Sequence, residues 1–129
     1  IIISDETLVR LSDPTEYYFR FIEKIQLNES ADAMAIFEIY DVDPEPVKFI
    51  KIESRNDYER GLLHFYNADY DKAMDCFEVI LNLNPNDKIV LKYMEQSQNL
   101  KQYSITSFNL PDIEAHLGNL SIDQSQNNQ

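Results

Sequence analysis

The sequence predicts an α+β fold, in which a short helix and an antiparallel β-hairpin precede a helical hairpin and a capping helix. Residues 17–40 alternate between apolar and polar side chains with a period of two, as β-strands do. Residues 54–103 instead carry apolar side chains at helical spacing. Between them, residues 41–46 hold two prolines and three carboxylates. We therefore expect a piece over 1–40, a linker over 41–53, a helical piece over 54–103 and a largely disordered tail over 104–129.

Composition excludes several classes of function. The chain has 129 residues, 43% of them apolar, which is enough for a folded core. Its net charge of −12 disfavours binding to nucleic acid or to an anionic membrane surface. No apolar run approaches the roughly 20 residues that span a bilayer, and no signal peptide is recognisable. A single cysteine rules out an internal disulfide and suits a reducing compartment, so a cytoplasmic location is expected.

The first residues predict a strand followed by a short helix. Ile1–Ile3 has the composition of a buried strand with nothing before it, so we expect a fragment of a larger protein. Ser4 is the predicted N-cap of a helix that ends near Leu11. Asp5 and Glu6 then lie in its first turn, where the helix dipole favours negative charge.

Two strands follow and predict an antiparallel hairpin. Tyr17 to Leu27 alternates with one mostly apolar face, and Ala33 to Tyr40 does the same. The polar segment from Asn28 to Asp32 forms the predicted turn between them. A short helix and a two-stranded ribbon cannot bury both faces of a sheet alone. Residues 1–40 are therefore interpreted as the end of a domain.

The boundary segment is acidic and contains proline. Asp41 and Asp43 raise the possibility of a calcium site, but the glycine and the final glutamate of a calcium loop are missing. A solvated linker is the preferred interpretation. Val47 to Ile52 is compatible with either a short helix or an extended chain.

The next segment predicts a helical hairpin. Ser54 to Asp57 is interpreted as a capping box that starts the first helix. Asn67 to Asp69 forms the turn, Asp69 caps the second helix, and Pro85 marks its end. Asp87 starts a third helix with a polar outer face, which is typical of a helix that caps a repeat array.

Four residues of the hairpin carry a resemblance to the tetratricopeptide repeat. Gly61 and Ala73 are small enough for two helices to approach closely, Phe77 fills the space between them, and Pro85 follows. These offsets resemble those of the tetratricopeptide motif. The segment differs at two positions, with Asp57 and His64 in place of the usual tryptophan and tyrosine.

The candidate interaction residues are aromatic. They lie on the predicted helices and form core by default, but become a binding surface where they stay exposed: Tyr58, Phe65, Tyr66, Tyr70 and Tyr93. No catalytic, cofactor-binding or metal-binding residue is predicted. The chain has only two glycines, which are too few for a glycine-rich phosphate loop. Cys76 has no histidine nearby in its helix and is interpreted as structural.

The N-terminal third resembles the end of a class III adenylate/guanylate cyclase catalytic domain. Ile1 to Leu8 is similar to the strand and helix that follow the active site in that family. The segments 17–22, which includes Arg20, and 35–40, which includes Glu38, match the family's next two strands. The sequence differs at Glu23, where glycine is usual, and in the turn. With the boundary and the helical repeat, the resemblance covers roughly residues 1–100.

The resemblance implies a parent enzyme that converts ATP or GTP to a cyclic nucleotide and pyrophosphate in signal transduction. Such enzymes use two aspartate-bound divalent metal ions, Mg²⁺ or Mn²⁺, and act as dimers. The family's catalytic positions all lie upstream of Ile1, so the resemblance implies that this chain itself is inactive.

Two hypotheses of function follow. In the first, the chain is the C-terminal regulatory or interaction segment of a nucleotide cyclase, and its partner is its own catalytic domain or the homodimer mate. In the second, it is a tetratricopeptide adaptor that acts alone. One repeat with a cap falls short of the roughly three that usually make a stable groove, which favours the first hypothesis. A further possibility is that the tail from Ser104 folds back over the hairpin.

Overall fold

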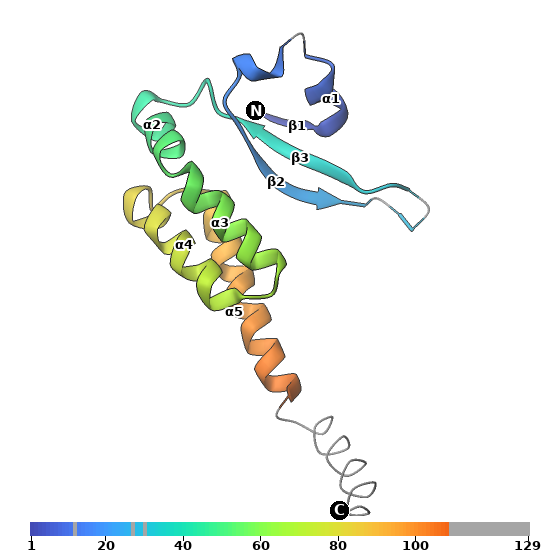
Figure 1. Ribbon diagram of the computed structural model, residues 1–129, viewed down its shortest axis with the longest axis vertical. Coiled ribbons are helices and arrows are strands. Elements are labelled where there is room, and N and C mark those ends of the chain that lie inside the picture. The colour runs from blue at the N-terminus through green and yellow to red at the C-terminus, as the bar shows by residue number, and fades with distance from the viewer. Residues whose placement is uncertain (12, 27, 30, 109–129) are drawn as a thin grey trace, which may run out of the picture. The chain divides into compact units, whose positions relative to one another are not determined.

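The chain forms two compact units that meet between Asn56 and Asp57 (Figure 1). The computed structural model describes residues 1–11, 13–26, 28–29 and 31–108. The first unit contains a small sheet with short helices, and the second is helical. The structure is therefore α+β, as predicted.

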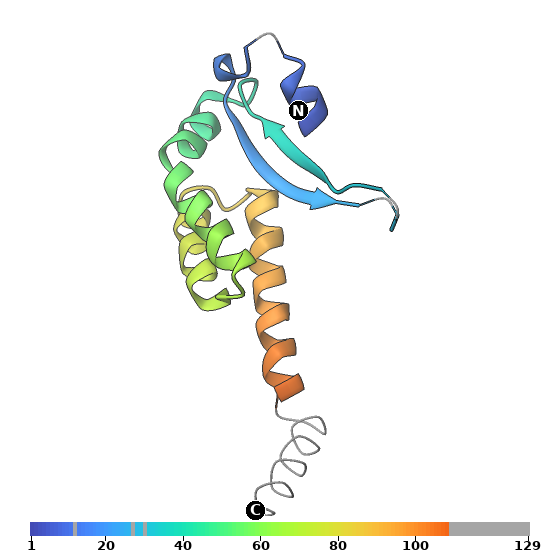
Figure 2. The same ribbon diagram turned by 45° about the vertical axis from the view of Figure 1, so that its right-hand side comes forward.

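The sheet of the first unit has three strands in the order β1-β3-β2. Its strands are β1 (Ile2–Ser4), β2 (Phe19–Ile25) and β3 (Met34–Ile39), and both pairings are antiparallel. The predicted β2–β3 hairpin is confirmed, and Figure 2 shows it as a twisted ribbon. The pairing of β1 with β3 was not predicted, because a strand of three residues has no readable periodicity and its partner is distant in sequence.

Aromatic side chains hold the two longer strands in register. Phe37 on β3 lies opposite Phe21 on β2, and its ring meets the rings of Phe21 and Phe19 edge to face at centroid distances of 5.8 Å. Such cross-strand aromatic pairs stabilise a sheet beyond the area they bury. A bulge shifts the register between Phe21 and Glu23.

The predicted N-terminal helix is present but short. In α1 (Asp5–Val9), the hydroxyl of Ser4 accepts a hydrogen bond from the backbone N–H of Thr7 at 3.3 Å, which confirms the N-cap. The helix ends at Val9, two residues before the predicted end. A single 3₁₀ turn, η1 (Pro14–Glu16), leads into β2.

Residues 41–53 contain a helix, which is one of the two alternatives that the sequence left open for Val47 to Ile52. Most of the segment forms α2 (Glu45–Glu53). Pro44 is its N-cap and Pro46 lies in its first turn, where no backbone N–H is needed for the helix. The prolines thus start this helix and do not mark a solvated boundary.

Three helices follow, and their first boundary corrects a prediction. They are α3 (Arg55–Tyr66), α4 (Tyr70–Leu83) and α5 (Lys88–Phe108). The predicted capping box at Ser54 is wrong: its hydroxyl donates to the carbonyl of Ile50 at 2.6 Å instead of capping α3. Serine and threonine often bond back to the preceding turn in this way. Residue 54 is therefore the junction between α2 and α3.

The ends of α4 and α5 largely follow the prediction. Asp69 is the N-cap residue of α4, although its side chain makes no cap hydrogen bond. Asp87 precedes α5, and its carboxylate accepts from the N–H of Val90 at 3.3 Å. α5 continues to Phe108, so the first five residues of the predicted tail, 104–108, are helical. The rest of the predicted tail, residues 109–129, lies outside the described residues.

The close approach of α3 and α4 at Gly61 is confirmed. A β-carbon placed on Gly61 would lie 2.5 Å from Cε1 of Phe77, which is well inside van der Waals contact. Phe77 and Ala73 are both fully buried. Val79 and Leu83 of α4 are 45% and 54% exposed, so these two apolar side chains do not belong to the core.

The turn between α3 and α4 contains a strained alanine. Asp69 N–H donates to the carbonyl of His64 at 2.8 Å and Ala68 N–H to that of Phe65 at 3.0 Å, the pattern of a Schellman motif. Ala68 occupies its left-handed position with φ of 62°, where glycine is usual.

We expect Ala68→Gly to stabilise the helical unit by about 0.5–1 kcal/mol, because it removes the steric cost of a β-carbon at positive φ. Urea unfolding followed by circular dichroism measures the change. Asn67→Gly in the same turn is a suitable control, since Asn67 does not have a positive φ and gains no such relief. A loss of stability in the Ala68→Gly variant would contradict the assigned turn.

Candidate protein-interaction site

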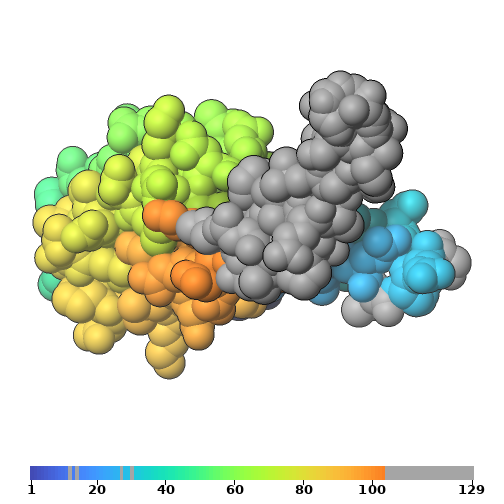
Figure 3. All heavy atoms as spheres, turned by 90° about the horizontal axis from the view of Figure 1, so that it is seen from below, coloured from blue at the N-terminus to red at the C-terminus, as the bar shows by residue number. Residues whose placement is uncertain are grey.

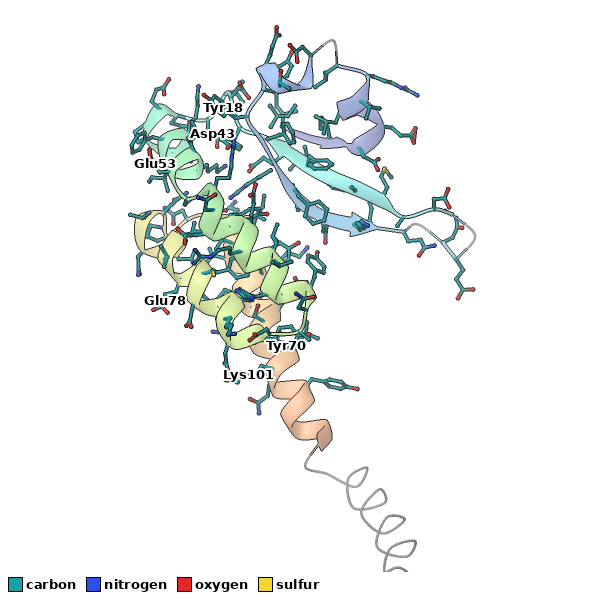
Figure 4. The ribbon with its side chains drawn as sticks, viewed as in Figure 1. Tyr18, Asp43, Glu53, Tyr70, Glu78 and Lys101 are labelled. Atoms are coloured by element: carbon teal, nitrogen blue, oxygen red, sulfur yellow. The ribbon has the colours of Figure 1, made fainter. Side chains whose placement is uncertain are left out.

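Four of the five predicted interaction residues meet in one aromatic cluster of the helical unit. The cluster consists of Phe65 and Tyr66 on α3, Tyr70 on α4 and Tyr93 on α5. The ring of Phe65 is central, with centroid distances of 5.1 Å to Tyr66, 5.8 Å to Tyr70 and 4.9 Å to Tyr93, all edge to face. Figure 4 labels Tyr70 at the start of α4. Three helices therefore contribute to one surface feature.

The cluster has a buried base and an exposed edge. Tyr93 is 4% exposed and stacks on Phe77, with centroids 5.6 Å apart. Tyr66 is 57% exposed, and its hydroxyl lies 2.8 Å from that of Tyr93. Phe65 and Tyr70 are half-buried. The core thus fixes the position of a tyrosine that is presented to solvent.

The fifth candidate, Tyr58, lies apart from this cluster. Its side chain is 3% exposed, and it belongs to the core of the helical unit. A side chain this buried does not contact a partner unless the helices move. The same holds for Tyr93, so the candidate contact surface narrows to Tyr66 and Tyr70, with Phe65 and Tyr93 supporting them.

The chemistry of this cluster suits recognition of protein. Tyrosine combines a large apolar ring with a polar hydroxyl and is enriched at protein interfaces. Among the described residues, no three side chains of the metal-ligating types converge on one point. Cys76 is buried, as the structural interpretation requires, and the guanidinium of Arg60 lies 3.9 Å from its sulfur.

The first unit contains an ion-pair network that the sequence analysis did not predict. Lys51 of α2 lies 3.1 Å from Glu38 and 2.6 Å from Asp43, and Arg20 lies 2.8 Å from Glu38. The four side chains are only 8–20% exposed. Arg20 and Glu38 are direct cross-strand partners on β2 and β3, so the network attaches α2 to the sheet.

Aromatic rings border this network. The ammonium of Lys51 lies 5.6 Å from the ring centroid of the buried Tyr40, and that of Lys48 lies 5.6 Å from the ring of Tyr18. Tyr18 and Tyr40 stack at 5.9 Å. Figure 4 labels Tyr18 and Asp43 at the end of the β2–β3 hairpin that lies next to α2. We assign the network to the stability of the first unit, since charged pairs that share a buried site are costly to break.

A groove between α4 and α5 is the second feature that the sequence analysis missed. Its volume is about 570 Å³, and we call it the acidic groove; it is lined by Asp71, Met74, Asp75, Glu78, Met94 and Gln98. Figure 3 looks at the helical unit from below, with α5 in orange against α4 in yellow-green. The signal was present as carboxylates at positions 71, 75 and 78, which share one helix face.

Comparison with known proteins gives one informative similarity. The chain is 24% identical over 96 residues to an adenylate cyclase of Dictyostelium discoideum that is described as specific to terminal differentiation. The match covers 74% of this chain but only 4% of the cyclase. This similarity supports a relationship to adenylate cyclases, in agreement with the resemblance noted in the sequence. No protein-family model matches the chain, and no solved structure matches it.

None of the helices in the described part of the chain combines the length and apolar character needed to cross a lipid bilayer.

Proposed function

We propose that this chain is a protein-interaction and regulatory segment of a nucleotide cyclase, and that it acts through the exposed edge of its aromatic cluster. The similarity to an adenylate cyclase supports the cyclase context, because it runs over 96 residues and therefore includes residues of both units. The observation that carries the interaction role is Tyr66, 57% exposed yet fixed by the buried Tyr93. A tyrosine held in place in this way loses little entropy on binding.

The proposed partner is the catalytic domain of the same protein or the second copy in a dimer. Contact at Tyr66 and Tyr70 would stabilise one arrangement of the catalytic domains and so change the rate of cyclic nucleotide formation. The two divalent metal ions, Mg²⁺ or Mn²⁺, and the residues that bind them are proposed to belong to the parent enzyme outside this chain. The proposed role of this chain is then to position the catalytic domains, and the catalytic residues belong to the rest of the parent enzyme.

The alternative is an adaptor of the tetratricopeptide type that acts alone. The close contact at Gly61 and Phe77 is compatible with such a hairpin. Two observations favour the cyclase segment. One hairpin followed by α5 is shorter than the arrays of about three repeats that usually form a groove, and the similarity to the adenylate cyclase also extends into the sheet-containing unit.

The complete protein that carries this segment provides the test. Tyr66→Ala is expected to change its cyclase activity by at least about fivefold, the lower range of typical coupling between sites. Tyr103→Ala is the matched control, because Tyr103 is 69% exposed on α5 and outside the cluster. Cyclic nucleotide production by purified enzyme is the measurement. Equal activities of the wild type and the Tyr66→Ala variant would refute the regulatory role.

A further inference from the structure

The acidic groove combines negative charge with apolar contact area. Asp71, Asp75 and Glu78 are exposed along one face of α4, at a spacing of i, i+4 and i+7. Between α4 and α5, the half-buried Met74 and Met94 line the same groove. Methionine is flexible and polarisable, which lets it adapt to apolar partners of different shape. The groove thus offers carboxylates beside adaptable apolar side chains.

One carboxylate of the groove already forms an ion pair with a lysine of the same chain. Lys101 of α5 places its ammonium 2.5 Å from Asp71. Within the part of the chain that the structure describes, Asp75 and Glu78 have no such ion-pair partner. Like charges one turn apart on a helix repel each other, and an added cation relieves that repulsion. The pair at Asp71 shows that a carboxylate on this face of α4 can pair with a lysine ammonium.

We propose that the acidic groove binds a basic amphipathic helix of a protein partner. Its lysine or arginine side chains, three or four residues apart, would pair with Asp75 and Glu78, and its apolar side chains would contact Met74 and Met94. The helix-in-groove mode uses this combination of spaced anchors. Charge complementarity selects this occupant, because the chain carries a net charge of −12. The proposal involves the helical unit alone and does not depend on the cyclase assignment.

The test uses the complete 129-residue chain and a labelled model peptide. The probe is a helical peptide of ~15 residues made of leucine and lysine, with the lysines on one face. A peptide of the same composition with the pattern scrambled is its control. Fluorescence anisotropy gives both dissociation constants. We expect the patterned peptide to bind at least about tenfold more tightly than the scrambled one.

Two sets of variants locate the binding surface. The double variant Asp75→Asn with Glu78→Gln is expected to weaken binding by at least about tenfold. The control double variant, Glu53→Gln with Glu59→Gln, removes the same charge from two exposed sites outside the groove and should change binding less than about twofold. Met74→Gln is expected to weaken binding by about threefold, since it removes part of the apolar contact.

Three results would overturn the proposal. The first is equal binding of the patterned and scrambled peptides, and the second is an equal loss of binding in the two double variants. The third is binding of spermine at the groove in the absence of any binding of the patterned peptide. That result would assign the groove to small polycations. Circular dichroism of each variant confirms that its helices are intact.

Discussion

Replacement of Lys51 by methionine is expected to destabilise the first unit by about 3–5 kcal/mol, the usual cost of removing one partner from a buried ion pair. Lys51 contacts both Glu38 and Asp43, and its own side chain is only 8% exposed. Methionine keeps most of the side-chain volume but removes the ammonium group. Asp43 then loses its ion pair with Lys51, whereas Glu38 keeps its ion pair with Arg20. Urea unfolding followed by circular dichroism measures the loss.

Lys24→Met is the matched control for this prediction. Lys24 lies on β2 of the same unit and is exposed, so its replacement should change stability by less than about 0.5 kcal/mol. If Lys51→Met proves no more destabilising than Lys24→Met, the network does not hold α2 to the sheet. The ion pairs of Lys51 would then contribute little to the stability of the first unit.

Gly61→Ala should destabilise the helical unit by about 1–3 kcal/mol, although alanine is the better helix former by about 1 kcal/mol. The added methyl group would lie 2.5 Å from the ring of Phe77, which is fully buried and stacked on Tyr93. The ring therefore has to shift against Tyr93 to make room for the methyl group. Chemical unfolding of the purified variant gives the sign and size of the effect.

A double-mutant cycle separates this clash from other causes. Phe77→Leu alone removes packing and destabilises the unit. If the clash is the cause, Gly61→Ala should cost less in the Phe77→Leu background than in the wild type, with a coupling of about 1 kcal/mol or more. Additive effects would contradict the proposed contact between α3 and α4.

The sequence predicted the elements whose patterns are local. The alternation over 17–40 identified β2 and β3, and the small residues Gly61 and Ala73 identified the tight contact of two helices. The alternation repeats within one segment, and the two small residues have a fixed spacing along the hairpin, so both signals can be recognised without the tertiary structure. The aromatic candidates were also correctly placed on helices.

Features that depend on distant residues were missed. The pairing of β1 with β3 joins Ile3 to Phe37, and no local pattern reports such a partner. The hydroxyl of Ser54 was assigned to the wrong helix, because either of two adjacent helices can use it. Pro44 and Pro46 indicated a solvated linker in the sequence, although the same residues suit the first turn of α2.

The candidate site also combines features that follow from local sequence patterns with features that depend on distant residues. Tyr58, Phe65, Tyr66, Tyr70 and Tyr93 share helical spacing, but only the packing of three helices decides which are buried. Tyr58 and Tyr93 point into the core, whereas Tyr66 reaches solvent. The acidic groove needs residues of both α4 and α5, so neither helix alone reveals it.

A binding measurement tests the proposed interaction role of the aromatic cluster. Sedimentation velocity would be recorded for the 129-residue chain alone and with the catalytic domain of the proposed parent cyclase. We predict a complex, either with that domain or between two copies of the chain, that Tyr66→Ala weakens by at least about tenfold and Tyr103→Ala leaves unchanged. A chain that stays monomeric and binds no catalytic domain, or equal affinities of the two variants, would contradict the interaction role of the cluster.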